Sequence, residues 1–431
     1  MRDIAASHAF EENSSATSTG RSRAYSWYVA AMLSMLAALA QIDKQAPFIL
    51  AEKMATDLHL SDTQLGVIGG VAFSLFFTLA CLPIAVLADR TSRKWVIVSA
   101  VAVWSCMTAS SGWARGFFEL FLARIGVAVG EAGGFAPSQS LISDYFGPGE
   151  RAAAMSLFTF GSTLGVMAGF AGGGWVADNF GWRTAFMVLG LPGMALAVLM
   201  TFTLRELPRQ VRPPSVGKLG SLRRLFAKRT YLFVVVAMCL LSLGINGIFA
   251  WSPPLLIRSF GLSTAQAGLI LGLLVGLAGG FGTLVSGWLA DRLGRRDRRW
   301  HLTLPAHAMF AAAPIMIAAI WSPILAATIV CMAIALPLLT GAVPIFYAVA
   351  QDLSPSRDRV FAAAFLVFAS NLVGGGIAPV LIGFLSDLLQ PLAGDMALKM
   401  GLTVVMGFSA LGGFACLAGT ASLSADLELG E

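Results

Sequence analysis

The sequence predicts an all-α membrane protein with twelve transmembrane helices arranged as two pseudo-symmetric six-helix bundles. Of its 431 residues, 57% are hydrophobic and only 12% are charged, whereas roughly a quarter of the residues of a soluble domain are charged. The apolar residues form long stretches, each close to the ~20 residues that a helix needs to cross a bilayer. An internal repeat indicates that these stretches belong to two related halves.

The repeat is centred on two ten-residue segments. Residues 287–296 read Gly-Trp-Leu-Ala-Asp-Arg-Leu-Gly-Arg-Arg, and residues 85–94 read Ala-Val-Leu-Ala-Asp-Arg-Thr-Ser-Arg-Lys, at an offset of 202. Repeats of this size indicate that one fold unit was duplicated. Shorter paired segments have the same offset or one close to it, namely 262–268 with 60–66 and 383–387 with 174–178.

The chain divides into five segments. Residues 1–25 are polar and lack the apolar core of a signal peptide, so we expect a disordered cytoplasmic tail followed by a retained first helix. Residues 26–204 are predicted to form the N-terminal bundle, 205–230 a basic cytoplasmic linker, 231–421 the C-terminal bundle and 422–431 a cytoplasmic tail. The predicted spans lie at about 26–50, 64–87, 95–113, 117–145, 152–177, 183–204, 231–257, 265–290, 301–321, 324–351, 360–386 and 398–420.

The basic residues assign the orientation of these spans. With the N-terminus inside, 22 of the 29 lysines and arginines fall on the inner side and five on the outer side, as the positive-inside rule requires. The linker region carries eight of them against one acidic residue, Glu206, and we expect it to lie on anionic lipid headgroups. Both termini are therefore predicted to be cytoplasmic, and this distribution argues against nucleic acid as a partner.

Four charged residues lie inside the predicted spans of the N-terminal half, where a charge is costly and therefore a candidate for function. Asp43 and Lys44 are in the first span, and Arg124 and Glu131 are in the fourth. At about 1.5 Å per residue, Asp43 and Arg124 fall at similar depths, so an ion pair between them is geometrically plausible. Glu131 lies two helical turns deeper on the same face, with no second basic residue expected at its level. The role of Lys44, about 100° around the helix from Asp43, stays open.

Glu131 is the candidate proton carrier. A carboxyl group that is buried without a partner tends to keep its proton. If Glu131 and Asp43 compete for Arg124, protonation changes the charge that a substrate meets. We therefore predict that Arg124, Glu131 and Asp43 bind substrate, and that Glu131 and Asp43 couple transport to protons. The alternative is an ion pair that only fixes two helices.

The C-terminal half has no clear charge within its spans. Its candidates for substrate contact are Asn246, Trp251, Tyr347 and Asn371, although helix packing alone would explain each of them. A charged wall facing an apolar wall suits an amphipathic ligand, with its ionic head near Arg124 and its tail toward the C-terminal spans.

The two long repeat segments lie in predicted inner loops. Their charged side chains can cap helix ends and form ion pairs that hold the inner side shut; solvated turns are the alternative. The predicted gating residues are Asp89, Arg90, Arg93, Asp291, Arg292 and Arg295.

Enzyme motifs do not occur where they could work. The sequence has no suitably placed Walker lysine motif, dinucleotide glycine fingerprint, His-Glu metal motif or nucleophile elbow. Its five cysteines lie in apolar segments without paired spacing, which argues against a metal site or a disulfide. We therefore expect no enzymatic activity, no cofactor and no metal. The energy must come from an ion gradient or from the gradient of the substrate itself.

Twelve spans in two halves, with the Gly-x-Leu-Ala-Asp-Arg-x-Gly-Arg-Arg loop, resemble the major facilitator superfamily from residue 26 onward. The N-terminal half further resembles the Spinster family of lysolipid and sphingolipid transporters. Ala85 and Lys44 depart from the family's glycine and arginine, and a lysine weakens bidentate contact with a headgroup. The resemblance is carried by Ile42-Asp43-Lys44, Asp89-Arg90, Arg93-Lys94, Arg124, Val129-Gly130-Glu131-Ala132, Pro137, Leu141-Ile142, Asp144, Gly181-Trp182-Arg183, Arg205-Glu206 and Pro208-Arg209.

The resemblance implies a proton-coupled secondary transporter that works by alternating access between two bundles, with Arg124, Glu131 and Asp43 tied to substrate and protons. The implied substrate is a lysophospholipid or a sphingoid-type lipid. Two alternatives stay open: a multidrug or organic-anion exchanger of the same superfamily, and a transport-inactive receptor or scaffold. The expected partners are the substrate, protons and membrane lipids, the expected location is a bacterial inner membrane, and the expected state is a monomer.

Overall fold

The computed structural model describes residues 22–206, 224–355 and 358–428. The predicted N-terminal tail up to residue 21, the linker over 207–223 and the last three residues lie outside this described part. Within it, every regular element is a helix, and ten helical stretches are long and apolar enough to cross a membrane. Two of these stretches, 149–203 and 361–420, each reverse once, so the described chain crosses twelve times, as predicted.

The two reversals occur at glycines in the left-handed region, which glycine occupies without steric cost. Gly181 has a φ of 83° and divides the long helix α9 into two spans. Gly394 has a φ of 54° and separates α17 from α18. The helices of the N-terminal half are α2 (Arg23–Ile49), α3 (Ala51–Leu58), α4 (Asp62–Gly69), α5 (Val71–Arg90), α6 (Arg93–Ser110), α7 (Phe117–Ala132), α8 (Phe135–Tyr145) and α9 (Pro148–Thr203).

The C-terminal half contains two segments of π-helix, which are wider than an α-helix and frequently occur at functional sites. These are η2 (Leu274–Gly279), between α12 and α13, and η3 (Asn371–Ile377), between α16 and α17. The other helices are α11 (Arg229–Phe260), α12 (Thr264–Leu273), α13 (Gly280–Gly294), α14 (Trp300–Trp321), α15 (Leu325–Asp352), α16 (Arg359–Ser370), α17 (Ala378–Ala393), α18 (Ala397–Thr420) and α19 (Leu423–Glu428).

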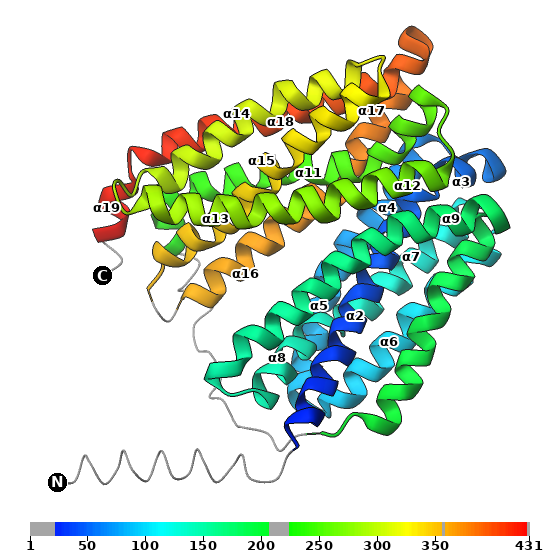
Figure 1. Cartoon of the computed structure of the whole chain (residues 1–431), viewed down its shortest axis with the longest axis horizontal. Coiled ribbons are helices and arrows are strands. Elements are labelled where there is room, and N and C mark those ends of the chain that lie inside the picture. The colour runs from blue at the N-terminus through cyan, green and yellow to red at the C-terminus, as the bar shows by residue number, and fades with distance from the viewer. Residues whose placement is uncertain (1–21, 207–223, 356–357, 429–431) are drawn as a thin grey trace.

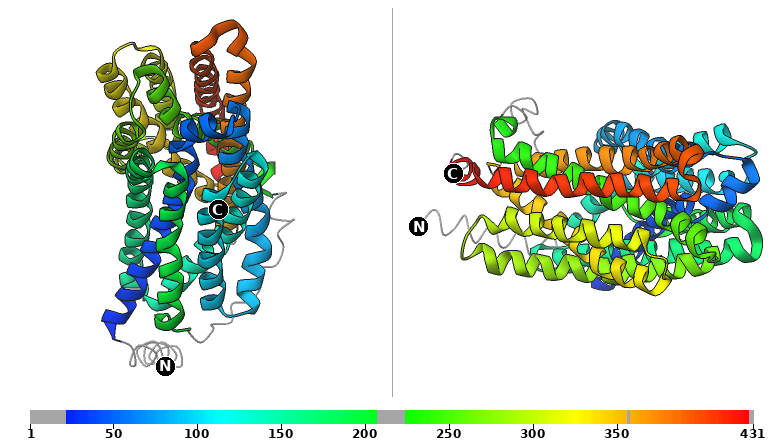
Figure 2. Two further views of the ribbon diagram at one scale, coloured as in Figure 1. Left: turned by 90° about the vertical axis from the view of Figure 1, so that its right-hand side faces the viewer. Right: turned by 90° about the horizontal axis from the view of Figure 1, so that it is seen from above.

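The two halves form separate bundles that meet at one end and diverge toward the other (Figure 1). We call the end at which α2 begins and α19 lies the inner end, after the side to which the sequence assigns the termini, and the opposite end the outer end. Figure 2 shows the long helices running lengthwise between these ends.

The hydrophobic cores confirm that the halves are joined near the outer end. One buried cluster consists only of residues of the N-terminal half, including Leu33 and Trp104. The other contains the core of the C-terminal half together with Ile49, Leu65 and Phe170 of the N-terminal half. Close packing makes such a shared core cohesive, so the outer end is closed in this structure.

The helices α4 and α12 begin with the same local design at the outer end. Ser61 caps α4 and Ser263 caps α12, and in both cases a glutamine three residues later returns a side-chain hydrogen bond to the cap. This capping box satisfies backbone N–H groups that would otherwise be unpaired at a helix start. The two caps are 202 residues apart in the sequence, so the repeat found in the sequence corresponds to equivalent helix starts in the two halves.

The short helix α3 is fixed at the outer end by its contact with α9. The carboxylate of Asp57 accepts hydrogen bonds from Arg183 and from the indole N–H of Trp182. These bonds hold the pKa of Asp57 below its ordinary value, because they stabilise the charged form.

Candidate functional site

Two adjoining hollows lie between the halves. We call the larger, of about 710 Å³, the inner chamber, and the smaller, of about 270 Å³, the deep chamber. The deep chamber is nearer the outer end, because it reaches Gln45 and Phe48 of α2, whereas the inner chamber reaches Leu36. Both volumes are of the order of ligand sites in proteins. The chambers share lining residues and therefore form one cavity: Gln41, Lys44, Phe73, Ser74 and Asn371.

Arg124 lines the deep chamber from α7. Its side chain is almost fully buried, and its Nη1 donates a hydrogen bond to the main-chain oxygen of Asp43 at 3.1 Å. The guanidinium carbon lies 5.3 Å from the centre of the Phe73 ring, and within the described part of the chain Nε has no hydrogen-bond partner. A buried guanidinium with a free N–H near a cavity is suited to bind an anion.

Asp43 lies beside Arg124, as the depth estimate predicted, but the hydrogen bond between them uses the main chain of Asp43 rather than its carboxylate. Asp43 is 2% exposed, and its Oδ1 has no hydrogen-bond partner among the described residues. Asp43 does not line either chamber. Asp43 is therefore not among the residues that would contact a ligand in the cavity of this structure.

Glu131 lines the inner chamber from α7 and has a basic partner that the sequence did not predict. Its Oε2 lies 4.0 Å from Nζ of Lys44, while its Oε1 is buried and has no partner in the segments that the structure describes. Lys44 points into the cavity, and its ammonium lies 5.2 and 5.3 Å from the ring centres of Phe73 and Phe77. Backbone depth alone placed no basic residue at the level of Glu131. The long, flexible side chain of Lys44 reaches Glu131 from a different backbone depth.

The predicted contacts from the C-terminal half are only partly at the cavity. Asn246 lines the deep chamber, Tyr347 lines the inner chamber, and Asn371, the first residue of η3, lines both. Trp251 differs from the prediction: it is 2% exposed, lines neither chamber, and its indole N–H donates to the main-chain oxygen of Pro379 at 3.0 Å. Trp251 therefore joins α11 to α17 instead of facing a ligand.

The apolar part of the cavity wall comes from both halves, not from the C-terminal half alone as the sequence suggested. Phe73, Phe77, Trp104 and Phe135 of the N-terminal half line the inner chamber. Sequence reasoning also missed two glutamines of α2, Gln41 and Gln45, at the deep chamber. Their spacing of four residues places them on one helix face, and this was the signal that could have identified them.

The predicted gating residues lie at the inner end. Arg93 forms an ion pair with Asp144, and Arg292 lies over the ring of Trp288; both contacts are within one half. The side chains of Arg90, Asp291 and Arg295 are exposed, and that of Asp89 lies outside the described part of the chain. Because the halves diverge at this end, the inner-gate hypothesis stays a prediction.

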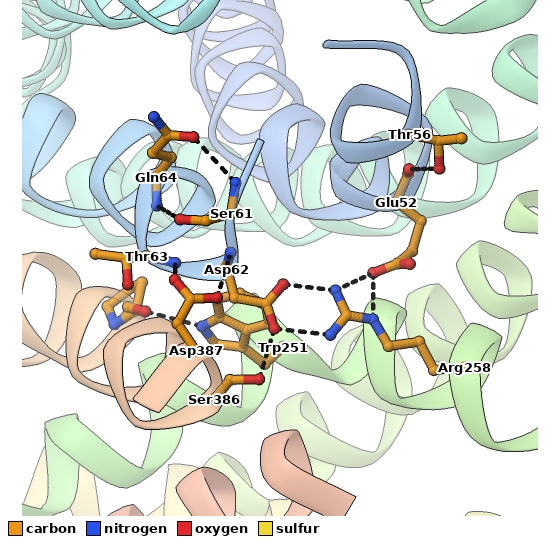
Figure 3. A network of polar contacts seen from close by, with 11 residues as sticks. Glu52, Thr56, Ser61, Asp62, Thr63, Gln64, Trp251, Arg258, Ser386 and Asp387 are labelled. Atoms are coloured by element: carbon orange, nitrogen blue, oxygen red, sulfur yellow. Dashed lines mark hydrogen bonds and ion pairs between the residues drawn. The ribbon is translucent and has the colours of Figure 1, made fainter. Parts of the chain in front are cut away.

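A polar network joins the halves at the outer end (Figure 3). Arg258 of α11 donates to both carboxylate oxygens of Asp62, at 2.6 and 2.7 Å, and to Glu52 at 2.8 Å. Asp387 of α17 accepts hydrogen bonds from the backbone N–H groups of Asp62 and Thr63, at 3.1 and 2.8 Å. A carboxylate at a helix start is stabilised by free N–H groups and by the helix dipole, so Asp387 binds the start of α4 from the opposite half.

An equivalent contact occurs on the other side of the pseudo-symmetry. Asp178 of α9 accepts a hydrogen bond from the backbone N–H of Ala265, at 2.7 Å, and so binds the start of α12. Asp178 also pairs with Lys53 at 3.1 Å. The sequence contained both aspartates as copies of the repeat, but nothing in it indicated which helix each would face.

Comparison with known proteins places the chain among transporters. The sequence model of the Major Facilitator Superfamily matches residues 28–379. An MFS-type efflux pump of Mycolicibacterium smegmatis is 32% identical over 88% of this chain and 89% of its own length. Protein spinster homolog 1 of Homo sapiens is 26% identical over 86% of this chain and 75% of its own.

The fold has a close structural counterpart. The crystal structure of a bacterial homolog to the human lysosomal transporter Spinster, in an inward-facing and unoccupied conformation, superposes with a TM-score of 0.86. It is 25% identical and covers 94% of this chain and 99% of its own.

Proposed function

The chain belongs to the Major Facilitator Superfamily, and we propose that it is a proton-coupled transporter of an amphipathic lipid. The lead substrate is a lysophospholipid or sphingoid-type lipid whose head carries an anionic phosphate. As a multi-pass member of a transporter family, it performs secondary transport by alternating access between its two halves. The proposed location is the inner membrane, with both termini cytoplasmic, as the basic residues predict.

The observation that carries the substrate proposal is the distribution of charge in the cavity. The deep chamber is lined by Arg124 and Lys44, and no carboxylate is among its lining residues. The inner chamber adds the aromatic rings of Phe77, Trp104 and Phe135. A ligand with an anionic head and an apolar body would place each part against a matching wall.

Proton coupling is supported by the pairing of Glu131 with Lys44. While Glu131 is ionised, it attracts the ammonium of Lys44, 4.0 Å away. When Glu131 takes up a proton, Lys44 loses this partner and its charge becomes available to an anion in the cavity. Proton uptake by Glu131 therefore strengthens anion binding.

Replacing Glu131 by glutamine is expected to abolish the response to a pH gradient, because the side chain can no longer gain or lose a proton. We would measure movement of a labelled lysophospholipid into proteoliposomes with and without the gradient. The transported lipid is the fraction that albumin, added outside, cannot extract. Gradient-driven movement in the wild type should fall, in Glu131→Gln, to the level without a gradient, while exchange of lipid at equal pH remains.

The matched control is Glu119→Gln, the same change at an exposed position in the first turn of the same helix; it should respond to the gradient like the wild type. Full gradient-driven transport by Glu131→Gln would refute the assigned role and leave Asp43, the buried carboxyl beside Arg124, as the candidate proton site. A wild-type protein that moves no lysophospholipid would refute the lipid proposal.

A multidrug or organic-anion exchanger is the second candidate, because the M. smegmatis relative is described as an efflux pump. The same cavity would bind lipophilic anions of varied shape through Arg124. Competition of several unrelated lipophilic anions with one another, with no transport of lysophospholipid, would favour this reading over the first.

Alternating access requires the outer end to open, and Arg258 opposes this opening. The substitution Arg258→Ala removes the hydrogen bonds to two carboxylates and is expected to destabilise the outward-closed state by about 1.5–3 kcal/mol. The population of the outward-open state should therefore rise about tenfold or more. Distances between spin labels on the outer ends of α4 and α17 would lengthen.

The control is Lys399→Ala, which also removes a basic side chain at the outer end. Lys399 forms no ion pair in the described chain, so this variant should leave the distances unchanged. Unchanged distances in Arg258→Ala would show that the network does not hold the outer end.

A further inference from the structure

We propose that the deep chamber is a subsite for a hydroxyl-rich anion, in which Arg124 and Lys44 hold the negative charge and side-chain amides hold the hydroxyl groups. The proposal rests on the proposed function only in treating the cavity as the transport site. The amide-bearing residues of this subsite are Gln41, Gln45, Asn246 and Asn371.

The first observation is an excess of unused hydrogen-bonding groups. The side chains of Gln41, Gln45 and Asn371 form no hydrogen bond within the described chain, and neither does the hydroxyl of Ser74. Gln45 is 8% exposed, and its Oε1, like Nε of Arg124, is buried and has no hydrogen-bond partner among the residues described. Gln41 is half-buried and Asn371 is exposed, so these two amides are open to the hollow. A buried polar group without a partner is costly inside a membrane protein, so Gln45 and Arg124 at the same hollow indicate a polar occupant.

The second observation is which groups are present. A hydroxyl both donates and accepts hydrogen bonds, and a carboxamide offers an acceptor oxygen and donor N–H groups in one planar unit. Several carboxamides around a small chamber therefore match several hydroxyls. In Asn246, Nδ2 already donates to the main-chain oxygen of Ser242 at 3.0 Å, which leaves its carbonyl oxygen for a ligand.

The third observation disfavours a zwitterionic headgroup in the deep chamber. A quaternary ammonium needs a carboxylate or open aromatic faces. The lining of the deep chamber includes no carboxylate. The ring of Phe73 is already covered by Lys44 and Arg124, and the ring of Phe77 by Lys44. Phe48 and Phe249 also line the chamber, but an ammonium group there would meet the like charges of Arg124 and Lys44 with no carboxylate in the lining to oppose them.

The amides also come from both halves. Gln41 and Gln45 lie one turn apart on α2, Asn246 lies on α11, and Asn371 begins the π-helical segment η3. A ligand that bonds to all of them connects the N-terminal half to the C-terminal half at the deep end of the cavity. Recognition of the hydroxyls would in this way be coupled to the approach of the halves.

A hydroxyl-rich anion can be the polyol headgroup of an anionic lysolipid or a free sugar acid. We would measure direct binding of each radiolabelled ligand to the purified full-length protein in nanodiscs, with binding to empty nanodiscs subtracted. The ligands are lysophosphatidylglycerol and lysophosphatidylcholine with the same acyl chain, and glucuronate as a free sugar acid. Wild-type protein should bind the glycerol headgroup roughly tenfold or more tightly than the choline headgroup, as expected for two or more hydrogen bonds and one unopposed charge.

The variants locate the preference. Gln45→Leu should reduce affinity for lysophosphatidylglycerol several-fold and leave that for lysophosphatidylcholine unchanged. Asn371→Leu, in the C-terminal half, should likewise reduce affinity for lysophosphatidylglycerol only. It provides an independent test if Gln45→Leu fails to fold. Gln390→Leu, the same change at an exposed site of α17, should retain the wild-type preference.

The outcomes separate this proposal from the lipid proposal. Equal binding of both lysolipids, unchanged in Gln45→Leu and Asn371→Leu, would overturn the subsite while leaving lysolipid transport intact. Binding of glucuronate without either lysolipid would overturn the lipid substrate while supporting the subsite for a free sugar acid. Binding of lysophosphatidylglycerol with a preference lost in both variants would support the two proposals together.

Discussion

Replacing Arg124 by glutamine is expected to reduce transport of an anionic substrate to background. Arg124 is 1% exposed and presents a free N–H beside the deep chamber. A hydrogen bond from a charged donor contributes about 1.5–3 kcal/mol, so binding should weaken by about 10- to 100-fold. The loss of transport should be larger than this loss of binding, because Asp43 and Glu131 then remain buried near the cavity without the charge of Arg124.

The measurement combines ligand affinity, transport and thermal stability of each purified variant. Arg124→Lys keeps the charge but loses the planar guanidinium, and should be intermediate in affinity. Arg115→Gln, at an exposed site just before the same helix, is the matched control and should behave as wild type. If Arg124→Gln is folded and binds an anionic lysolipid as tightly as the wild type, the cavity does not recognise its ligand through this residue.

The fold and the charged part of the cavity could be predicted because both depend on the cost of burying charge in lipid. Long apolar stretches predicted the twelve crossings, and four charges stood out within them. Lys44, Arg124 and Glu131 line the cavity, whereas Asp43 does not. Uncharged polar residues cost less to bury, so the sequence indicated less clearly which of them line the cavity. Trp251, which was predicted to contact substrate, packs against α17. Gln41 and Gln45, which were not predicted, lie at the deep chamber.

Contacts that depend on side-chain reach or on distant pairing could not be predicted. The pairing of Lys44 with Glu131 depends on the lysine stem extending along the cavity wall. The contact between Asp62 and Asp387 joins residues 325 positions apart in the sequence. The repeat indicated that Asp178 and Asp387 are equivalent, yet only the structure identifies the helix start that each one binds.

The repeat has a second consequence at the outer end, where two equivalent glycines let the halves approach. Gly66 of α4 and Gly268 of α12 are 202 residues apart in the sequence. A Cβ at Gly66 would lie 2.8 Å from the carbonyl carbon of Pro379 and 2.9 Å from Cα of Val380, both in the opposite half. A Cβ at Gly268 would lie 2.9 Å from the carbonyl carbon of Phe170. Backbone atoms at these distances cannot move aside locally, so a side chain requires the halves to separate.

Gly66→Val and Gly268→Val are therefore each expected to prevent outer closure and to nearly abolish transport. Overpacking of this kind costs about 1–3 kcal/mol or more, and here the cost falls on the closed state only, because the clash disappears when the halves part. Spin labels across the outer end should report the separated state for both variants, and Gly66→Ala should have a smaller effect.

The matched control is Gly172→Val, since a Cβ at Gly172 meets nothing within 4 Å. This variant should close at the outer end and transport normally. Normal closure in both variants would show that the two glycines are not required for the approach, whereas a defect in only one would show that the pseudo-symmetric contacts do not contribute equally.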